Sequence, residues 1–207
     1  MVKTAKEKPI LFSIEMVKAI LDGRKSQTRR VVKPQPPEKF KYPMQWSNGD
    51  VEFSDVPGDD DMANWWPGYE RPVKCPYPPG TILWVRETFA DLRPGNLVTM
   101  GGSQIVYKAT SEGTHRLVDR LKEITGKGWR PSIHMPREAA RLFLEVTNVR
   151  VERLQEISWE DVLAEGVLSS YETYCLGFVG LWNSINGKKY PWDSNPWVFV
   201  IEFRVVD

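Results

Sequence analysis

The sequence predicts an α+β fold, namely a small, partly open and mostly antiparallel β-barrel with short flanking helices. Short segments that alternate apolar and polar residues recur along the 207-residue chain, as in half-buried strands. The helical segments between them are brief and carry recognisable cap residues. Because a chain of this length can bury a sizeable core, we expect a single domain over residues 1–207.

The first strand and helix are predicted within residues 9–23. Residues 9–12 form a short apolar run, Pro-Ile-Leu-Phe, that is typical of a strand. Ser13 is a favourable N-cap for the helix that follows, and Gly23 is well suited to end it.

A proline-rich segment, residues 34–80, interrupts this pattern. Ten of the 16 prolines fall within it, and proline at such density excludes regular core elements. The pair Asn48-Gly49 still indicates a hairpin turn, because apolar residues flank it on both sides. We therefore interpret residues 34–80 as an insertion wrapped over the domain and as a candidate lid.

The remaining elements follow from hydrophobic periodicity. We expect strands at residues 81–87, 105–108, 142–154 and 197–205, and helices at residues 114–126, 158–166 and 178–185. The apolar phase of the long strand shifts at Asn148, which indicates a bulge there. The final strand is long and apolar and is expected inside a sheet. The last helix carries one apolar face, interpreted as core, made of Phe178, Leu181, Trp182 and Ile185.

Composition excludes several classes of protein. Cys75 and Cys175 lie far apart, and neither they nor His115 and His134 have metal-ligand spacing, so we expect no metal and no other cofactor. The first eight residues lack an apolar signal core and no run approaches a membrane span. We therefore expect a cytoplasmic protein with reduced thiols and no membrane partner.

A cluster of cations and hydroxyls follows the predicted end of the first helix. Lys25 and Thr28 lie three positions apart, and Ser26 offers a second hydroxyl. A desolvated lysine can take the proton of a hydroxyl, which makes Lys25 and Thr28 a candidate base and nucleophile. Arg24 and Arg30 are suited to hold an anionic or carbonyl oxygen. The alternative is a solvated surface run that includes an ordinary strand threonine.

Glu165 is a candidate general acid. It is predicted at the last turn of its helix, where the helix dipole disfavours a carboxylate and raises the pKa of the group, as general acid catalysis requires. An exposed surface carboxylate is the alternative, and the sequence favours neither.

Two further positions are candidates for nucleic-acid contact. Trp84 and Arg86 fall on one face of a predicted strand, where an indole and a guanidinium can meet a base or a sugar. Alternatively, Arg86 pairs with Glu87 or Glu152 beside a core tryptophan. His134, on a predicted loop, can titrate near neutral pH, although a lone histidine is more often structural.

Four motifs in a fixed order resemble the ASCH family (activating signal cointegrator homology domains), whose fold is a β-barrel related to the PUA domain. Gly23-x-Lys25-x-x-Thr28-x-Arg30 is similar to the family signature, and three later segments resemble its G-D-x-L-x-V strand, its helix ending in Glu-Gly and its last strand. Those segments are Pro79–Val85, Ile157–Gly166 and Trp197–Phe203. The length, the insertion and Trp-Val-Arg-Glu resemble the longer members found in phages and prophages.

The resemblance implies that the chain binds RNA or a nucleotide beside the signature. One bacterial subgroup hydrolyses the amide of 4-acetylcytidine with a Lys-x-x-Thr pair and a glutamate on the later helix, and Lys25, Thr28 and Glu165 match these in spacing. By this resemblance Lys25 activates Thr28, and Glu165 passes protons to the leaving amine. Arg24, Ser26, Arg30, Trp84 and Arg86 are then the expected nucleotide-binding residues. A non-catalytic RNA-binding module and a metal-independent ribonuclease, using His134 or the Lys25 cluster, are the alternatives.

Overall fold

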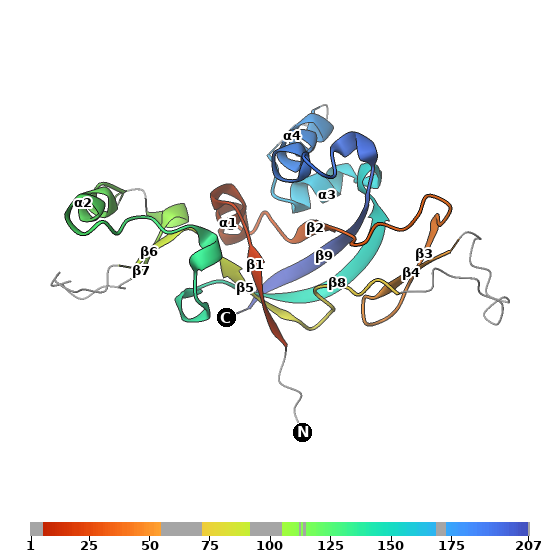
Figure 1. The fold of residues 1–207 in the computed structure, drawn as a ribbon, viewed down its shortest axis with the longest axis horizontal. Helices are drawn as coiled ribbons and strands as arrows, with labels where there is room; N and C mark the ends of the chain where they lie inside the picture. Colours follow the sequence, from red (N-terminus) through yellow and green to blue (C-terminus); the bar gives the residue numbers. More distant parts are fainter. Residues whose placement is uncertain are drawn as a thin grey trace, which may run out of the picture. The chain divides into compact units, whose positions relative to one another are not determined.

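The computed structural model describes residues 6–54, 72–91, 105–111, 113, 115–168 and 173–206 (Figure 1). The chain divides into two compact units. Unit 1 contains Arg24–Thr81 and Glu145–Arg204, and unit 2 contains Lys6–Gly23 and Ile82–Leu144. The insertion expected at residues 34–80 belongs to unit 1, with its middle part, residues 55–71, outside the described residues. That residues 1–207 form one domain stays a prediction.

The helices and strands include those that the hydrophobic pattern predicts, together with two strands that it does not, residues 27–31 and 89–91. They are β1 (Glu7–Leu11), α1 (Ile14–Leu21), β2 (Gln27–Val31), β3 (Tyr42–Gln45), β4 (Val51–Ser54), β5 (Ile82–Arg86), β6 (Phe89–Asp91), β7 (Ile105–Tyr107), α2 (His115–Thr125), β8 (Phe143–Arg153), α3 (Trp159–Ala164), α4 (Tyr174–Asn186) and β9 (Trp197–Val206).

The fold is α+β with mostly antiparallel strand pairs. β2 pairs with β9, β3 with β4 and β6 with β7 in antiparallel register, whereas β1 and β5 are parallel. The pairings among the described residues do not define a closed barrel, so the PUA-like barrel stays a prediction.

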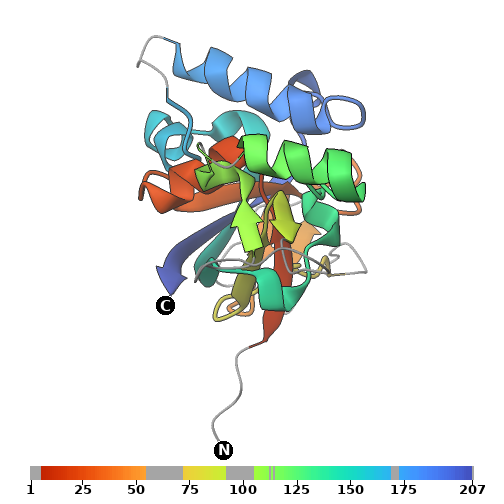
Figure 2. The same ribbon diagram turned by 90° about the vertical axis from the view of Figure 1, so that its left-hand side faces the viewer.

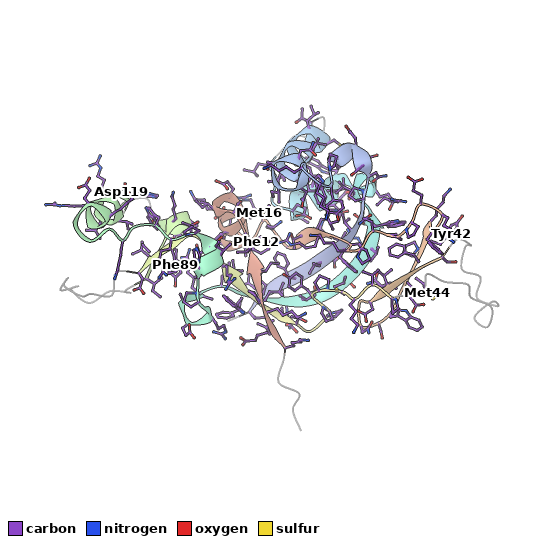
Figure 3. All side chains as sticks on the ribbon, viewed as in Figure 1. Phe12, Met16, Tyr42, Met44, Phe89 and Asp119 are labelled. Carbon is purple, nitrogen blue, oxygen red and sulfur yellow. The ribbon has the colours of Figure 1, made fainter. Side chains whose placement is uncertain are left out.

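In unit 1, β9 lies between β8 and β2, as expected for a long apolar strand. Residues 197–201 of β9 are buried on both faces, while Val205, expected on the buried face, is half exposed. The β3–β4 hairpin turns at Gly49, which adopts a positive φ of 82° at the predicted Asn-Gly turn. Val51 and Phe53 of β4 are buried, so the expectation that residues 34–80 hold no regular core element is wrong. Tyr42 and Met44 on β3 carry exposed side chains (Figure 3).

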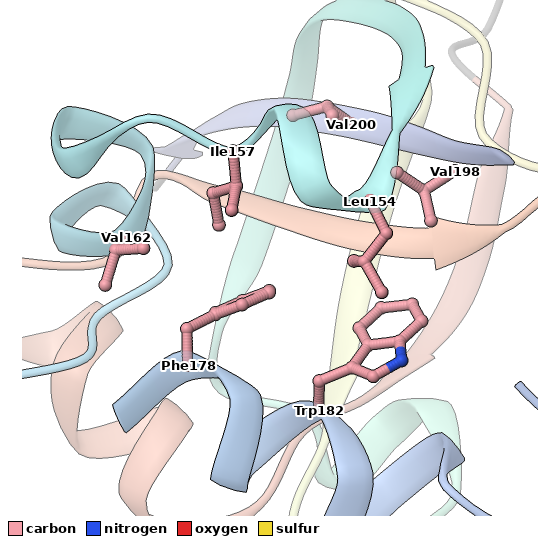
Figure 4. Packing of buried hydrophobic residues seen from close by; sticks show 7 residues of the cluster. All are labelled: Leu154, Ile157, Val162, Phe178, Trp182, Val198 and Val200. Carbon is pink, nitrogen blue, oxygen red and sulfur yellow. The ribbon is translucent and has the colours of Figure 1, made fainter. Parts of the chain in front are cut away.

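The core of unit 1 lies where α3 and α4 pack on the sheet. Phe178 and Trp182 project from α4 toward Leu154, Ile157 and Val162, with Val198 and Val200 completing the cluster (Figure 4). The indole N–H of Trp182 donates to the carbonyl of Tyr190 at 2.8 Å, so its polar group is satisfied. The predicted apolar stripe of this helix is only partly core, because the side chain of Ile185 is 59% exposed.

In unit 2, the side chain of Ser13 caps α1 by accepting a hydrogen bond from the backbone N–H of Met16, as predicted. α2 ends at Thr125, within the helix predicted at residues 114–126, and Gly126 follows it with a positive φ of 70°; residue 114 lies outside the described residues. α2 lies beside the β6–β7 pair (Figure 1 and Figure 2). Phe89, Met135 and Ala139 form a buried cluster here.

Candidate functional site

The candidate site forms where the chain enters β2 and runs beside the end of α3. Lys25 and Glu165 make an isolated antiparallel bridge, and the backbone N–H of Ser26 donates to the carbonyl of Ala164 at 2.9 Å. The helix that positions Glu165 is α3, which begins with a capping box between Ser158 and Asp161. Because α3 is held at its start and bridged at its end, Glu165 is fixed opposite Lys25.

Lys25 and Glu165 form a buried ion pair. The amine of Lys25 donates to Glu165 Oε2 at 2.8 Å and to the Glu165 carbonyl at 2.8 Å. Their side chains are 0% and 4% exposed. Burial lowers the pKa of Lys25, and this effect outweighs the opposing attraction of Glu165; the charges of Arg30 and Arg29 lower it further. An amine in this environment loses its proton more easily than one on the surface.

Arg29 binds the other oxygen of the Glu165 carboxylate. Its Nη1 lies 3.2 Å from Glu165 Oε1, and its Nη2 lies 2.8 Å from Asp161 Oδ2 and 2.6 Å from Glu152 Oε1. The Arg29 side chain is 1% exposed, and its guanidinium carbon lies 5.8 Å from the ring centre of Phe178. A guanidinium held on three carboxylates and an aromatic ring has little freedom to reorient.

Asp161 links α3 to two strands. Its Oδ1 accepts hydrogen bonds from Gln27 on β2 at 2.9 Å and from Arg150 on β8 at 2.6 Å. Burial alone would raise the pKa of Asp161, but the hydrogen bonds from Gln27 and Arg150 and the charges of Arg29 and Arg150 lower it below its usual value. The carboxylate is therefore held in its charged form.

Thr28 lies on the opposite face of β2 from Gln27 and Arg29, because successive side chains of a strand point to opposite sides. Its Oγ1 accepts a hydrogen bond from Arg30 Nη1 at 2.7 Å, and the residue is 1% exposed. Arg30 is half-buried; burial lowers its pKa, and Tyr77 and Glu165 oppose the shift. The charge of Arg30 is also among the causes that lower the pKa of Lys25.

The structure thus brings Lys25 and Glu165 into direct contact, whereas the contact it gives the Thr28 hydroxyl is with Arg30. The sequence interpretation that Glu165 is an exposed surface carboxylate is wrong, because the carboxylate is buried and doubly bonded. The alternative that Lys25 belongs to a solvated surface run is also wrong, because its side chain is buried.

The expected nucleotide-binding residues fall in both units. In unit 1, Arg24 Nη1 donates to the Gly166 carbonyl at 3.3 Å, and Ser26 is exposed. In unit 2, the guanidinium of Arg86 lies 4.8 Å from the ring centre of Trp84 on the half-exposed face of β5, and its Nε donates to the Met135 carbonyl at 3.1 Å. Trp84 and Arg86 therefore do present an indole and a guanidinium together.

The acidic alternatives for Arg86 have other partners. Glu87 is buried and accepts two hydrogen bonds from Arg141, at 2.9 and 3.0 Å. Glu152 binds Arg29 and Arg150 within unit 1. His134 is exposed in a 3₁₀ turn, Ser132–His134.

Sequence reasoning missed Arg29, Asp161 and Glu152. A signal was present, since Gln27 and Arg29 alternate on one strand, Arg150 and Glu152 on another, and Asp161 and Glu165 are spaced one helical turn apart. Charged residues that fall on one face of each of three elements indicate that these faces pack against one another.

No family model, curated protein or solved structure matches this chain. Within the described ranges, histidine, cysteine and carboxylate side chains form no group that could hold a metal ion. The described helices include none with the length and apolar character needed to cross a membrane.

Proposed function

We propose that the chain is a nucleotide- or RNA-binding protein of the ASCH family, with a PUA-like barrel, that hydrolyses the amide of an acylated cytidine-like nucleoside through Lys25, Thr28 and Glu165. The observation that supports it best is the buried amine of Lys25, 2.8 Å from the Glu165 carboxylate, together with the buried hydroxyl of Thr28, which accepts a hydrogen bond from Arg30. In this proposal the base Lys25, the acid Glu165 and the hydroxyl of Thr28 act together in one site.

The proposed chemistry begins at Thr28. Neutral Lys25 takes the hydroxyl proton of Thr28 as Oγ1 forms a bond to the acyl carbon. The C–N bond to the nucleobase amine breaks when its nitrogen receives that proton, passed from the Lys25 ammonium through Glu165. Water then hydrolyses the threonyl ester, which releases the carboxylic acid and restores Thr28.

The hydrogen bond from Arg30 favours this role of Thr28. A hydroxyl that accepts from a guanidinium keeps its own hydrogen available for a base. The positive charge of Arg30 also stabilises the negative charge that develops on Oγ1 during proton loss. We assign Arg24, Ser26 and Arg30 of unit 1 to the nucleotide. In unit 2, Trp84 and Arg86 are a separate candidate surface for stacking on a base.

One observation favours a second candidate, a non-catalytic RNA-binding module. Lys25 and Thr28 are buried, so an acyl group reaches them only after the surrounding side chains move. In the second candidate the Lys25–Glu165 pair only holds α3 against β2, and binding depends on exposed cations. Such binding weakens steeply with salt, because each phosphate contact releases counterions.

Turnover of 4-acetylcytidine separates the two candidates. We expect the wild-type protein to release acetate and cytidine, and Thr28→Ala and Lys25→Ala each to lower kcat by about 10³-fold or more. Glu145→Gln is a matched control in the same unit, because Glu145 forms an exposed pair with Arg204 at 2.6 Å. It should retain wild-type turnover.

Failure of the wild-type protein to hydrolyse any of a panel of acylated nucleosides would remove the enzymatic proposal. Salt-dependent RNA binding without product would then support the second candidate. Labelled single-stranded RNA incubated with a chelator tests the ribonuclease alternative, which cleavage in that mixture would support.

A further inference from the structure

The Glu165 carboxylate is shared between two cations. Lys25 binds Oε2 at 2.8 Å and Arg29 binds Oε1 at 3.2 Å. Arg29 is in turn held by Asp161 of α3 and Glu152 of β8, so three carboxylates from two elements fix one guanidinium. Arg29 is outside the Gly-x-Lys-x-x-Thr-x-Arg pattern, and the proposed mechanism gives it no step.

We infer that Arg29 is a positioning residue for the proposed reaction. Arg29 fixes the Glu165 carboxylate and competes with Lys25 for its negative charge, so that Lys25 can act as a base. This inference rests on the proposed function. It assigns Arg29 no contact with the substrate; Arg29 acts only through Glu165 and through its own charge.

The physical reason is competition for one negative charge. A carboxylate that binds a single lysine strongly stabilises the ammonium form of that lysine, because opposite charges a few ångström apart favour the charged state. When Arg29 occupies Oε1, the carboxylate is divided between two cations. The charges of Arg29 and Arg30, both on β2, also disfavour a third positive charge at Lys25.

The charges around this group come from several elements, including β9, whose Glu202 binds Arg150, and the segment before β2, whose Arg24 donates to the Gly166 carbonyl. β2 supplies Arg29 and Arg30, α3 and its end supply Asp161 and Glu165, and β8 supplies Glu152 and Arg150. Arg150 binds Asp161 and Glu152, so its positive charge offsets part of the negative charge of the carboxylates that hold Arg29. The Glu165 carboxylate is bound by Lys25 and Arg29.

An NMR titration of Lys25 in protein labelled with ¹³C at the lysine Cε tests the inference directly. Lys25→Arg identifies the Lys25 signal. We expect Arg29→Gln to move the titration of Lys25 to higher pH by about one unit or more. The low-pH limb of kcat/KM for 4-acetylcytidine should move in the same direction. Arg29→Lys, which keeps the charge but cannot span three carboxylates, should give a smaller shift.

Arg29→Gln leaves buried carboxylates without their cation and can prevent folding. The double variant Arg29→Gln/Glu152→Gln removes one carboxylate together with its partner, and it should show the same shift in a folded protein. Circular dichroism checks the fold of each variant.

The outcomes separate the two proposals. An unchanged Lys25 titration in a folded Arg29 variant, with a wild-type protein that hydrolyses 4-acetylcytidine, overturns the inference and leaves the proposed function standing. A wild-type protein without turnover on any acylated nucleoside overturns the proposed function, and the positioning role falls with it. A shift of both the titration and the pH limb supports both.

Discussion

Lys25 owes its chemistry to residues far away in the chain. Its main partner, Glu165, is 140 positions distant, and the Arg29–Glu152 contact spans 123 positions. The Lys-x-x-Thr spacing and the helix-end position of Glu165 single out these residues in the sequence. Their burial and their contact could not be predicted from it, because no local pattern encodes how two distant elements pack.

The two partners of this pair should differ in their effect on stability. Glu165→Gln leaves the buried amine of Lys25 without its carboxylate, and breaking a buried pair in this way costs about 3–5 kcal/mol. Lys25→Met should cost less, because Glu165 keeps its contact with Arg29 and methionine fills the space. Urea unfolding measures both.

Glu145→Gln again serves as the control, since exposed pairs contribute about 0–1 kcal/mol. A Lys25→Met variant that is less stable than Glu165→Gln would contradict the charge distribution described for this site.

At the scale of elements, β2 and α3 show what periodicity reveals and what it leaves open. The helix predicted at residues 158–166 is confirmed; it begins with a capping box at Ser158, and Gly166 follows it with a positive φ of 82°. The alternation of β2, however, places Thr28 with Arg30 on one face and Gln27 with Arg29 on the other. Spacing along the sequence suggested a Lys25–Thr28 pair, whereas in the structure the Thr28 hydroxyl accepts a hydrogen bond from Arg30, its neighbour on the same strand face.

Asp161 should control the acid stability of unit 1. Its folded-state pKa lies below the 3.8 of an ordinary aspartate, so its stabilisation is complete above that value and is lost as the pH falls further. Asp161→Asn should therefore lower stability at neutral pH and flatten the loss of stability between about pH 5 and about pH 2. Urea unfolding across this range measures the slope, and an equally steep acid limb in Asp161→Asn would count against the assignment.

α4 offers a second test at this scale. Phe178 is buried in the cluster with Trp182, whereas Ile185, one turn beyond on the predicted stripe, is exposed. Phe178→Ala should cost about 3–5 kcal/mol through a cavity beneath α4. Ile185→Ala should stay within about 0.5 kcal/mol of wild type. Similar losses for the two variants would show that the whole stripe is core, as the sequence alone suggested.

At the scale of the whole molecule, the sequence predicts the order of the elements well. The predicted strands, the Asn48-Gly49 hairpin and the interior place of β9 are confirmed, because alternation and turn residues act locally, whereas β2 and β6 were not predicted. The division into two units and the parallel pairing of β1 with β5 were not predicted. Both depend on which distant segments pack together. The sequence of a strand with one exposed face does not show whether its neighbour is parallel or antiparallel.

The most direct test of the catalytic proposal follows the acyl group itself. Wild-type protein is quenched during turnover of 4-acetylcytidine labelled in its acetyl group, and its peptides are mapped by mass spectrometry. The proposal predicts labelled acetyl on Thr28, and none on that peptide in Thr28→Val. Label on another residue, or turnover that persists in Thr28→Val, would contradict the role of Thr28 as the nucleophile.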